Sequence, residues 1–199
     1  MARPKGQTLT RTSIVEAAIN VLRSEGESSL GINSVARKLG IQPPSMYNHV
    51  KGNNDLYRLV ALHGWQQFTT YAQASLKPGM TGRAQLIAIA LSYRQCAKDY
   101  PELLSIAASH RMDLEDQEFA DLYNSLVGLY VNALTPWGFS EIEIIHSARM
   151  LNASFFGYAQ LEINGIFQRS QSLDETYEWM VLRLIDALEL KKDPAPLLH

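Results

Sequence analysis

Residues 31–52 read GINSVARKLGIQPPSMYNHVKG, and this stretch decides the fold. Apolar side chains recur at helical spacing in its first half, and Gly40 then stops that helix. Pro43 and Pro44 open a second short helix, because proline is tolerated in a first turn whose N–H groups have no partner. Two short helices joined by a tight turn at a glycine are typical of the helix-turn-helix, whose second helix enters the major groove of DNA. The pattern therefore predicts a helix-turn-helix in residues 31–50.

The predicted helix-turn-helix has an inner and an outer face. The apolar inner residues are Ile32, Val35, Ala36, Leu39, Ile41, Met46 and Val50. On the outer face, glutamine and asparagine pair with adenine, serine bonds either base type, and proline contacts the methyl group of thymine. A tyrosine hydroxyl and basic side chains suit phosphates, which position a protein without reading sequence. The candidate DNA-contacting residues are Arg37, Lys38, Gln42, Pro43, Pro44, Ser45, Tyr47, Asn48, His49 and Lys51.

Composition favours an ordinary globular protein, with 46% hydrophobic and 19% charged residues among 199. The single cysteine, Cys96, excludes an intramolecular disulfide and fits a reducing cytoplasm. We find no apolar run that would span a membrane and no signal peptide, so we expect a cytoplasmic protein. The net charge is −2, but residues 1–60 carry eight basic and four acidic side chains. This basic head on an acidic body suggests that the head faces a polyanion.

Helical periodicity and capping residues predict an all-α protein of about nine helices. Thr10 or Ser13 starts the first helix, and capping boxes at Ser140–Glu143 and Ser172–Glu175 start the last two. Glycine and proline separate the helices between these points. We expect a three-helix DNA-binding domain followed by a larger helical bundle. The expected boundaries are 1–52 for the first domain, 53–190 for the second with a connecting helix over about 53–76, and 191–199 for a tail.

An ordered set of residues carries a resemblance to a known family. The set is Ile14-x-x-Ala17-Ala18, Gly26, Val35-Ala36-x-x-Leu39-Gly40-Ile41, Met46-Tyr47-x-His49-Val50 and Asp55-Leu56. It resembles the DNA-binding domain of the TetR family of regulators. The resemblance implies a homodimer that represses transcription at a palindromic operator and is released by a small-molecule effector. Many members have serine or threonine where Gly31 stands, phenylalanine at Val50 and lysine at Asn53.

The last third of the chain resembles a subgroup of that family with a WHG-type, TetR-like C-terminal domain. The shared pattern is Gly157-Tyr158-x-x-Leu161-Glu162, followed by Gly165-x-Phe167. The resemblance implies that the eighth and ninth helices form the dimer interface, with candidate residues Phe155, Tyr158, Leu161, Trp179 and Arg183. It places the effector among the fourth to eighth helices, with candidate residues Tyr93, Cys96, His110, Tyr123, Tyr130, Asn152 and Phe156.

Two other functions stay open at this point. The chain could be a regulator relative that acts through a protein partner without binding DNA, or a small all-α enzyme. Glu143 and His146 have the spacing of half a di-metal site, but we find no second such pair. The sequence also lacks the common nucleophile, metalloprotease and nucleotide-binding motifs. We therefore expect no enzyme activity, metal or cofactor.

Overall fold

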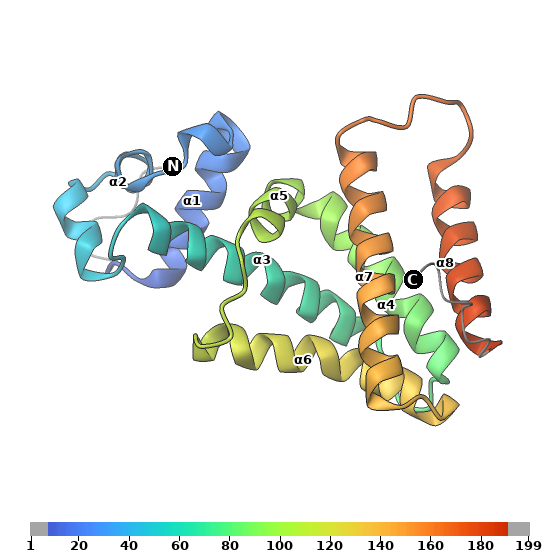
Figure 1. The fold of residues 1–199 in the computed structure, drawn as a ribbon. Coiled ribbons are helices and arrows are strands. Elements are labelled where there is room, and N and C mark those ends of the chain that lie inside the picture. The colour runs from blue at the N-terminus through green and yellow to red at the C-terminus, as the bar shows by residue number, and fades with distance from the viewer. Residues whose placement is uncertain (1–7, 191–199) are drawn as a thin grey trace, which may run out of the picture. The chain divides into compact units, whose positions relative to one another are not determined.

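The computed structural model describes residues 8–190, and in that range it contains helices and no strand (Figure 1). The predicted all-α class is confirmed. The α-helices are α1 Arg11–Glu25, α2 Ile32–Leu39, α3 Asn53–Ser75, α4 Gly82–Asp99, α5 Pro101–Ser109, α6 Gln117–Leu134, α7 Glu141–Ile163 and α8 Leu173–Glu189. Short 3-10 segments are η1 Glu27–Ser29, η2 Pro43–Asn48 and η3 Thr135–Trp137. The expected tail, 191–199, lies outside the described residues.

Side-chain caps start the helices where the sequence predicted them. The N–H of Ser13 donates to Thr10 Oγ1 at 3.1 Å, so Thr10 is the residue that caps α1. At α7, the N–H of Glu143 donates to Ser140 Oγ, and the N–H of Ser140 donates to Glu143 Oε2 at 2.6 Å. These reciprocal bonds satisfy N–H groups that have no partner inside the helix. Gly40 ends α2 in the left-handed region at φ 69°, which glycine adopts without steric cost.

The second helix of the helix-turn-helix has 3-10 rather than α geometry. The N–H of Ser45 donates to Gln42 O at 3.0 Å, and that of His49 donates to Met46 O at 2.9 Å. The two prolines remove two donors from this short segment, so few i→i−4 bonds are available to it.

The described chain divides into two compact units that differ from the two expected domains. The first unit runs to Gln67 and also includes Tyr100–Ala120, which contains α5. The second unit comprises Phe68–Asp99 and the chain from Asp121 onward. Helix α3 therefore begins in the first unit and ends in the second.

In the first unit, α5 joins the core through contacts distant in sequence. The Trp65 indole N–H donates to Ala107 O at 3.1 Å, and Arg23 Nε lies 2.6 Å from Glu102 Oε1. Apolar side chains of α1, α2 and η2 are also fully buried, including Ile14, Val35, Ala36 and Met46. These buried side chains include the inner face of the helix-turn-helix, which therefore packs into the core of the first unit.

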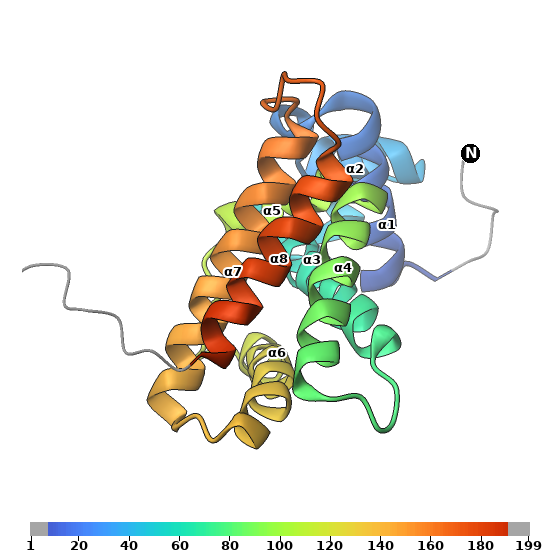
Figure 2. The same cartoon turned by 90° about the vertical axis from the view of Figure 1, so that its right-hand side faces the viewer.

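In the second unit, α4, α7 and α8 pack against one another, and both views place them side by side (Figures 1 and 2). Aromatic rings fill the space between them. Phe68 stacks on Tyr93 with ring centroids 4.6 Å apart, and Tyr177 meets Tyr158 at 5.0 Å and Phe155 at 6.3 Å. The Tyr177 hydroxyl is satisfied by donating to Ala90 O at 2.7 Å.

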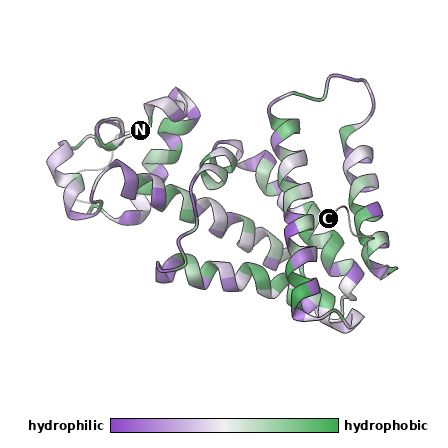
Figure 3. Ribbon diagram, viewed as in Figure 1, coloured by the Kyte–Doolittle hydropathy of each residue, from purple (hydrophilic) through white to green (hydrophobic). Residues whose placement is uncertain are grey.

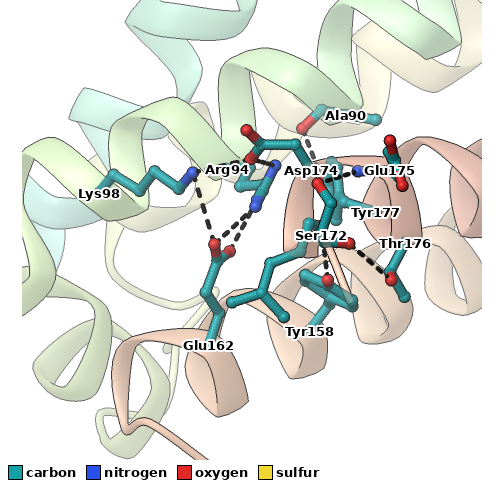
Figure 4. Close-up of polar contacts among 11 residues, drawn as sticks. Ala90, Arg94, Lys98, Tyr158, Glu162, Ser172, Asp174, Glu175, Thr176 and Tyr177 are labelled. Atoms are coloured by element: carbon teal, nitrogen blue, oxygen red, sulfur yellow. Dashed lines mark hydrogen bonds and ion pairs between the residues drawn. The ribbon is translucent and has the colours of Figure 1, made fainter. Parts of the chain in front are cut away.

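An arginine ties the three helices of the second unit together (Figure 4). Arg94 on α4 donates to both carboxylate oxygens of Glu162 on α7, at 2.7 and 2.6 Å. Its third nitrogen lies 2.8 Å from Asp174 on α8, and its guanidinium lies 4.9 Å from the ring centre of Tyr177. Burial raises the pKa of Glu162, but Arg94 and the nearby Lys98 outweigh it and hold that pKa below its usual value.

Hydrophilic and hydrophobic residues both occur along the long helices (Figure 3), as expected for elements that bury one face. Among residues 8–190, no helix has the length and apolar character needed to cross a bilayer.

Candidate nucleic-acid interface

The burial of the helix-turn-helix matches the predicted inner and outer faces. Met46 and Val50 are buried, whereas the Tyr47 side chain is 60% exposed. Ile41 is half-buried at the turn. The exposed candidates are Arg37, Lys38, Gln42, Pro44, Ser45, Tyr47, Asn48 and Lys51, and Pro43 and His49 are half-buried. Residues 31–52 therefore expose amide, hydroxyl, apolar and basic groups, which is the chemistry that base edges and phosphates require.

Residues 31–52 carry a net positive charge, whereas the described part of the first unit as a whole does not. Residues 31–52 contain three basic and no acidic side chains. The described part of the unit, 8–67 and 100–120, has seven basic and nine acidic side chains, because α5 and the segment after it are acidic. The basic head expected from the sequence is thus a local basic face.

Intramolecular carboxylates also occupy most arginines of the first unit. Arg37 Nη2 lies 2.7 Å from Glu25 Oε2, and Arg58 bonds Asp116 and Glu118. The bond from Arg58 holds the pKa of Asp116 below its usual value. An exposed pair such as Arg37–Glu25 contributes only about 0–1 kcal/mol, so a phosphate can displace its carboxylate.

Lysines supply the unpaired cations of the basic face. Lys38 and Lys51 are exposed, and within the described chain neither forms an ion pair. They are therefore available to phosphates without breaking an internal contact.

The N-terminus of α2 is completed by a residue from another helix. Gly31 precedes α2 and has no side chain to cap it, and Asn53 Oδ1 accepts the N–H of Ile32 at 3.0 Å. Ser34 Oγ accepts the N–H of Gly31 at 3.1 Å. In the sequence, Gly31 and Asn53 stand only as two separate departures from the pattern of the TetR family. The signal that links them is the cap position Gly31, which has no side chain, and an asparagine at the start of a helix 21 residues after Ile32.

The candidate dimer residues fall into two groups in the second unit. Phe155 and Tyr158 are buried inside the chain, at 0% and 8% exposure, so their side chains are unavailable to a second copy. Trp179 and Leu161 are exposed, at 62% and 41%. Arg183 is exposed and lies over the Trp179 ring, 5.6 Å from its centre.

The candidate effector residues are not gathered into one place. Tyr93, Cys96 and Tyr130 are buried in the second unit, and the Tyr130 hydroxyl donates to Asn152 Oδ1 at 2.6 Å. Phe156 is half-buried, and Tyr123 is exposed. His110 belongs to the first unit, where its ring stacks on Phe119. Burial raises the pKa of the Cys96 thiol to about 12, which keeps it protonated and inert.

Glu143, one of the two residues that suggested half a di-metal site, caps the start of α7. Glu143 accepts bonds from the N–H and the hydroxyl of Ser140, at 2.6 and 2.7 Å. Across residues 8–190, no three histidine, cysteine, aspartate or glutamate side chains are grouped to hold a metal ion.

Known proteins similar to this chain are transcriptional regulators. Residues 86–184 match the family described as "Tetracyclin repressor-like, C-terminal domain". An HTH-type transcriptional regulator of Mycobacterium tuberculosis, Rv0681, is 30% identical over 192 residues, which cover 95% of this chain and 85% of the relative.

Solved structures share the fold. A TetR variant from Acinetobacter baumannii, in complex with minocycline, superposes with a TM-score of 0.76 at 19% identity, covering 94% of this chain and 100% of that one. BioQ with its double-stranded DNA operator superposes with a TM-score of 0.68 at 19% identity, covering 92% and 99%.

Proposed function

The chain belongs to the TetR family of transcriptional regulators, and from this premise we propose that it binds double-stranded operator DNA through the exposed face of residues 31–52. The observation that carries the proposal is the composition of this face. It combines an exposed Tyr47, free lysines and base-reading side chains on a segment without acidic residues. A segment of this size fits the major groove.

We assign two roles on this face. Gln42, Ser45 and Asn48 read base edges, because their side chains are exposed along η2 and carry the needed donors and acceptors. Tyr47, Lys38 and Lys51 bind phosphates and set the position of the protein along the duplex. Arg37 joins them when a phosphate replaces Glu25 as its partner. Pro43, Pro44 and His49 complete the contact surface. Residues 1–52 then act as the DNA-binding part, although the compact unit is larger.

We propose that two copies pair through an exposed apolar surface on α7 and α8. Its large members are Ile142, Ile145, Leu161, Trp179 and Leu182, each at least 41% exposed. Exposed apolar surface of this extent marks an interface in a water-soluble protein. A two-fold dimer would present two heads to a palindromic operator, which offsets the weak binding of a single head.

We propose further that the protein is a repressor, released when a small molecule binds in the second unit. The helices α4 and α7 that carry Tyr93, Cys96, Asn152 and Phe156 pack together there. Support comes from the family and from the similar fold of the minocycline-bound TetR variant. A screen of small molecules for release of bound DNA tests this part separately.

The test of DNA binding begins with selection of bound DNA from a random pool by the full chain. We expect one enriched palindromic sequence. The variant Y47A should then bind every sequence more weakly, because a phosphate contact is lost. Q42A and N48A should instead lose discrimination between bases, by about 1–3 kcal/mol for each lost side chain–base pair. Leu114→Ala, at an apolar side chain 53% exposed outside residues 31–52, is the control and should bind like the original chain.

Two outcomes would count against the proposal. If the folded chain enriches no sequence, the regulator acts through a protein partner instead. If Y47A binds as tightly as the original chain, the assigned docking face is wrong.

A further inference from the structure

Helix α2 takes its N-terminal cap from α3. The first N–H groups of a helix have no partner within it and are usually satisfied by the side chain of the residue before the helix. That residue is Gly31, which has no side chain, and Asn53 Oδ1 accepts the N–H of Ile32 at 3.0 Å instead. Asn53 is the first residue of α3, so one hydrogen bond joins the starts of two helices.

We propose that Asn53 is a positioning residue for DNA binding, which replaces the missing cap of α2 and fixes the start of that helix against α3. This inference rests on the proposed function. Asn53 acts through α2 and the DNA-facing groups beside it.

The surroundings of the Asn53–Ile32 hydrogen bond explain why its loss would weaken DNA binding. The start of α2 borders a surface hollow of about 410 Å³, whose lining includes Asn33, Ser34, Tyr47, Asn53 and the Arg37–Glu25 pair. Among the described residues, the N–H groups of Asn33 and Ser34 have no hydrogen-bond acceptor. They remain free for a phosphate beside Tyr47. A start of α2 that frays would misplace these donors together with Arg37.

Glycine is not required at position 31 by geometry. Its backbone is extended, with φ −176° and ψ 169°, a conformation open to any residue. A Cβ placed there would lie 3.5 Å from Asn53 Oδ1, which is an ordinary contact. A serine at this position therefore fits and would supply its own cap to α2. This gives a rescue that separates capping from direct contact with DNA.

The experiment compares N53A, the double variant G31S/N53A and the control N54A, at an exposed asparagine beside it. Each full chain is titrated with the selected operator, and amide hydrogen exchange of α2 is measured without DNA. For N53A we expect affinity about fivefold lower on all sequences and α2 exchange about fivefold faster, which corresponds to one lost cap. G31S/N53A should restore both within about twofold, and N54A should change neither.

The outcomes distinguish this inference from the proposed function. If the original chain binds DNA and N53A binds equally well, the role of Asn53 is refuted. If G31S/N53A regains slow exchange in α2 but binds as weakly as N53A, Asn53 contacts the DNA directly and the positioning role is refuted. If the original chain binds no DNA, the proposed function fails first, whatever the exchange rates show.

Discussion

Replacing Arg94 with methionine should destabilise the second unit strongly, and the loss should depend on pH. The Arg94 side chain is only 9% exposed, and its partner Glu162 only 11%. Removing one member of a buried pair costs about 3–5 kcal/mol, because the other charge is left desolvated. Lys98 Nζ lies 3.4 Å from Glu162 Oε1 and retains part of the pairing. We therefore expect the low end of the range, about 3 kcal/mol at pH 7.

The pH dependence follows from the carboxyl group of Glu162. In the original chain its pKa is depressed below the ordinary value of 4.5, so the pair stabilises the fold above that pH and loses its effect as the pH falls. In R94M the pKa of Glu162 moves upward, because burial then acts against Lys98 alone. Relative to the original chain, that change destabilises the fold increasingly as the pH rises. The difference between the two chains should be full at pH 7 and should shrink below about pH 4.5.

Thermal unfolding followed by circular dichroism measures this difference. A loss of about 3 kcal/mol corresponds to a Tm roughly 6–12 °C lower in a chain of this size. The double variant R94M/E162Q removes the stranded charge and should recover most of the loss. If R94M melts within 2 °C of the original chain, or loses as much stability at pH 4 as at pH 7, the account of this network is wrong.

Three further tests probe local features by thermal unfolding or thiol labelling. Gly82→Ala should cost about 1–3 kcal/mol, since its Cβ would lie 2.1 Å from Ala133 O, whereas Gly128→Ala has open space and should be neutral or stabilising. Equal effects would contradict the close approach. Ser140→Ala should cost about 1 kcal/mol by removing the cap of α7, and an unchanged Tm would contradict that role. Cys96, whose pKa is raised to about 12, should resist thiol reagents until the chain unfolds. Rapid labelling of the folded chain would refute its burial.

Features set by neighbouring residues could be predicted from the sequence. The caps at Thr10 and Ser140 depend on a bond between residues three apart, and the stop at Gly40 depends on one residue. The buried side of the helix-turn-helix followed from helical spacing. The 3-10 geometry of η2 was not predicted. Prolines at the start of a segment indicate a helix, but the backbone donors they remove also limit its i→i−4 bonds, and the spacing pattern does not show this second effect.

Features set by residues distant in sequence could not be predicted in the same way. Arg94 meets a carboxylate 68 residues later, and Asn53 caps a helix that starts 21 residues earlier. Helix α5 groups with the first unit through contacts such as Trp65–Ala107, which no local pattern reveals. The family resemblance made Phe155 a candidate for the dimer surface, but the packing of the chain buries its side chain in the core.

The central claim is that the exposed face of residues 31–52 binds operator DNA through phosphates and base edges. Its most direct test is the affinity of the full chain for the selected operator between 50 and 200 mM salt. Two copies that each place Arg37, Lys38 and Lys51 on phosphates would neutralise about six charges, so affinity should fall roughly 10³-fold over that range. An affinity that does not change with salt would contradict the claim.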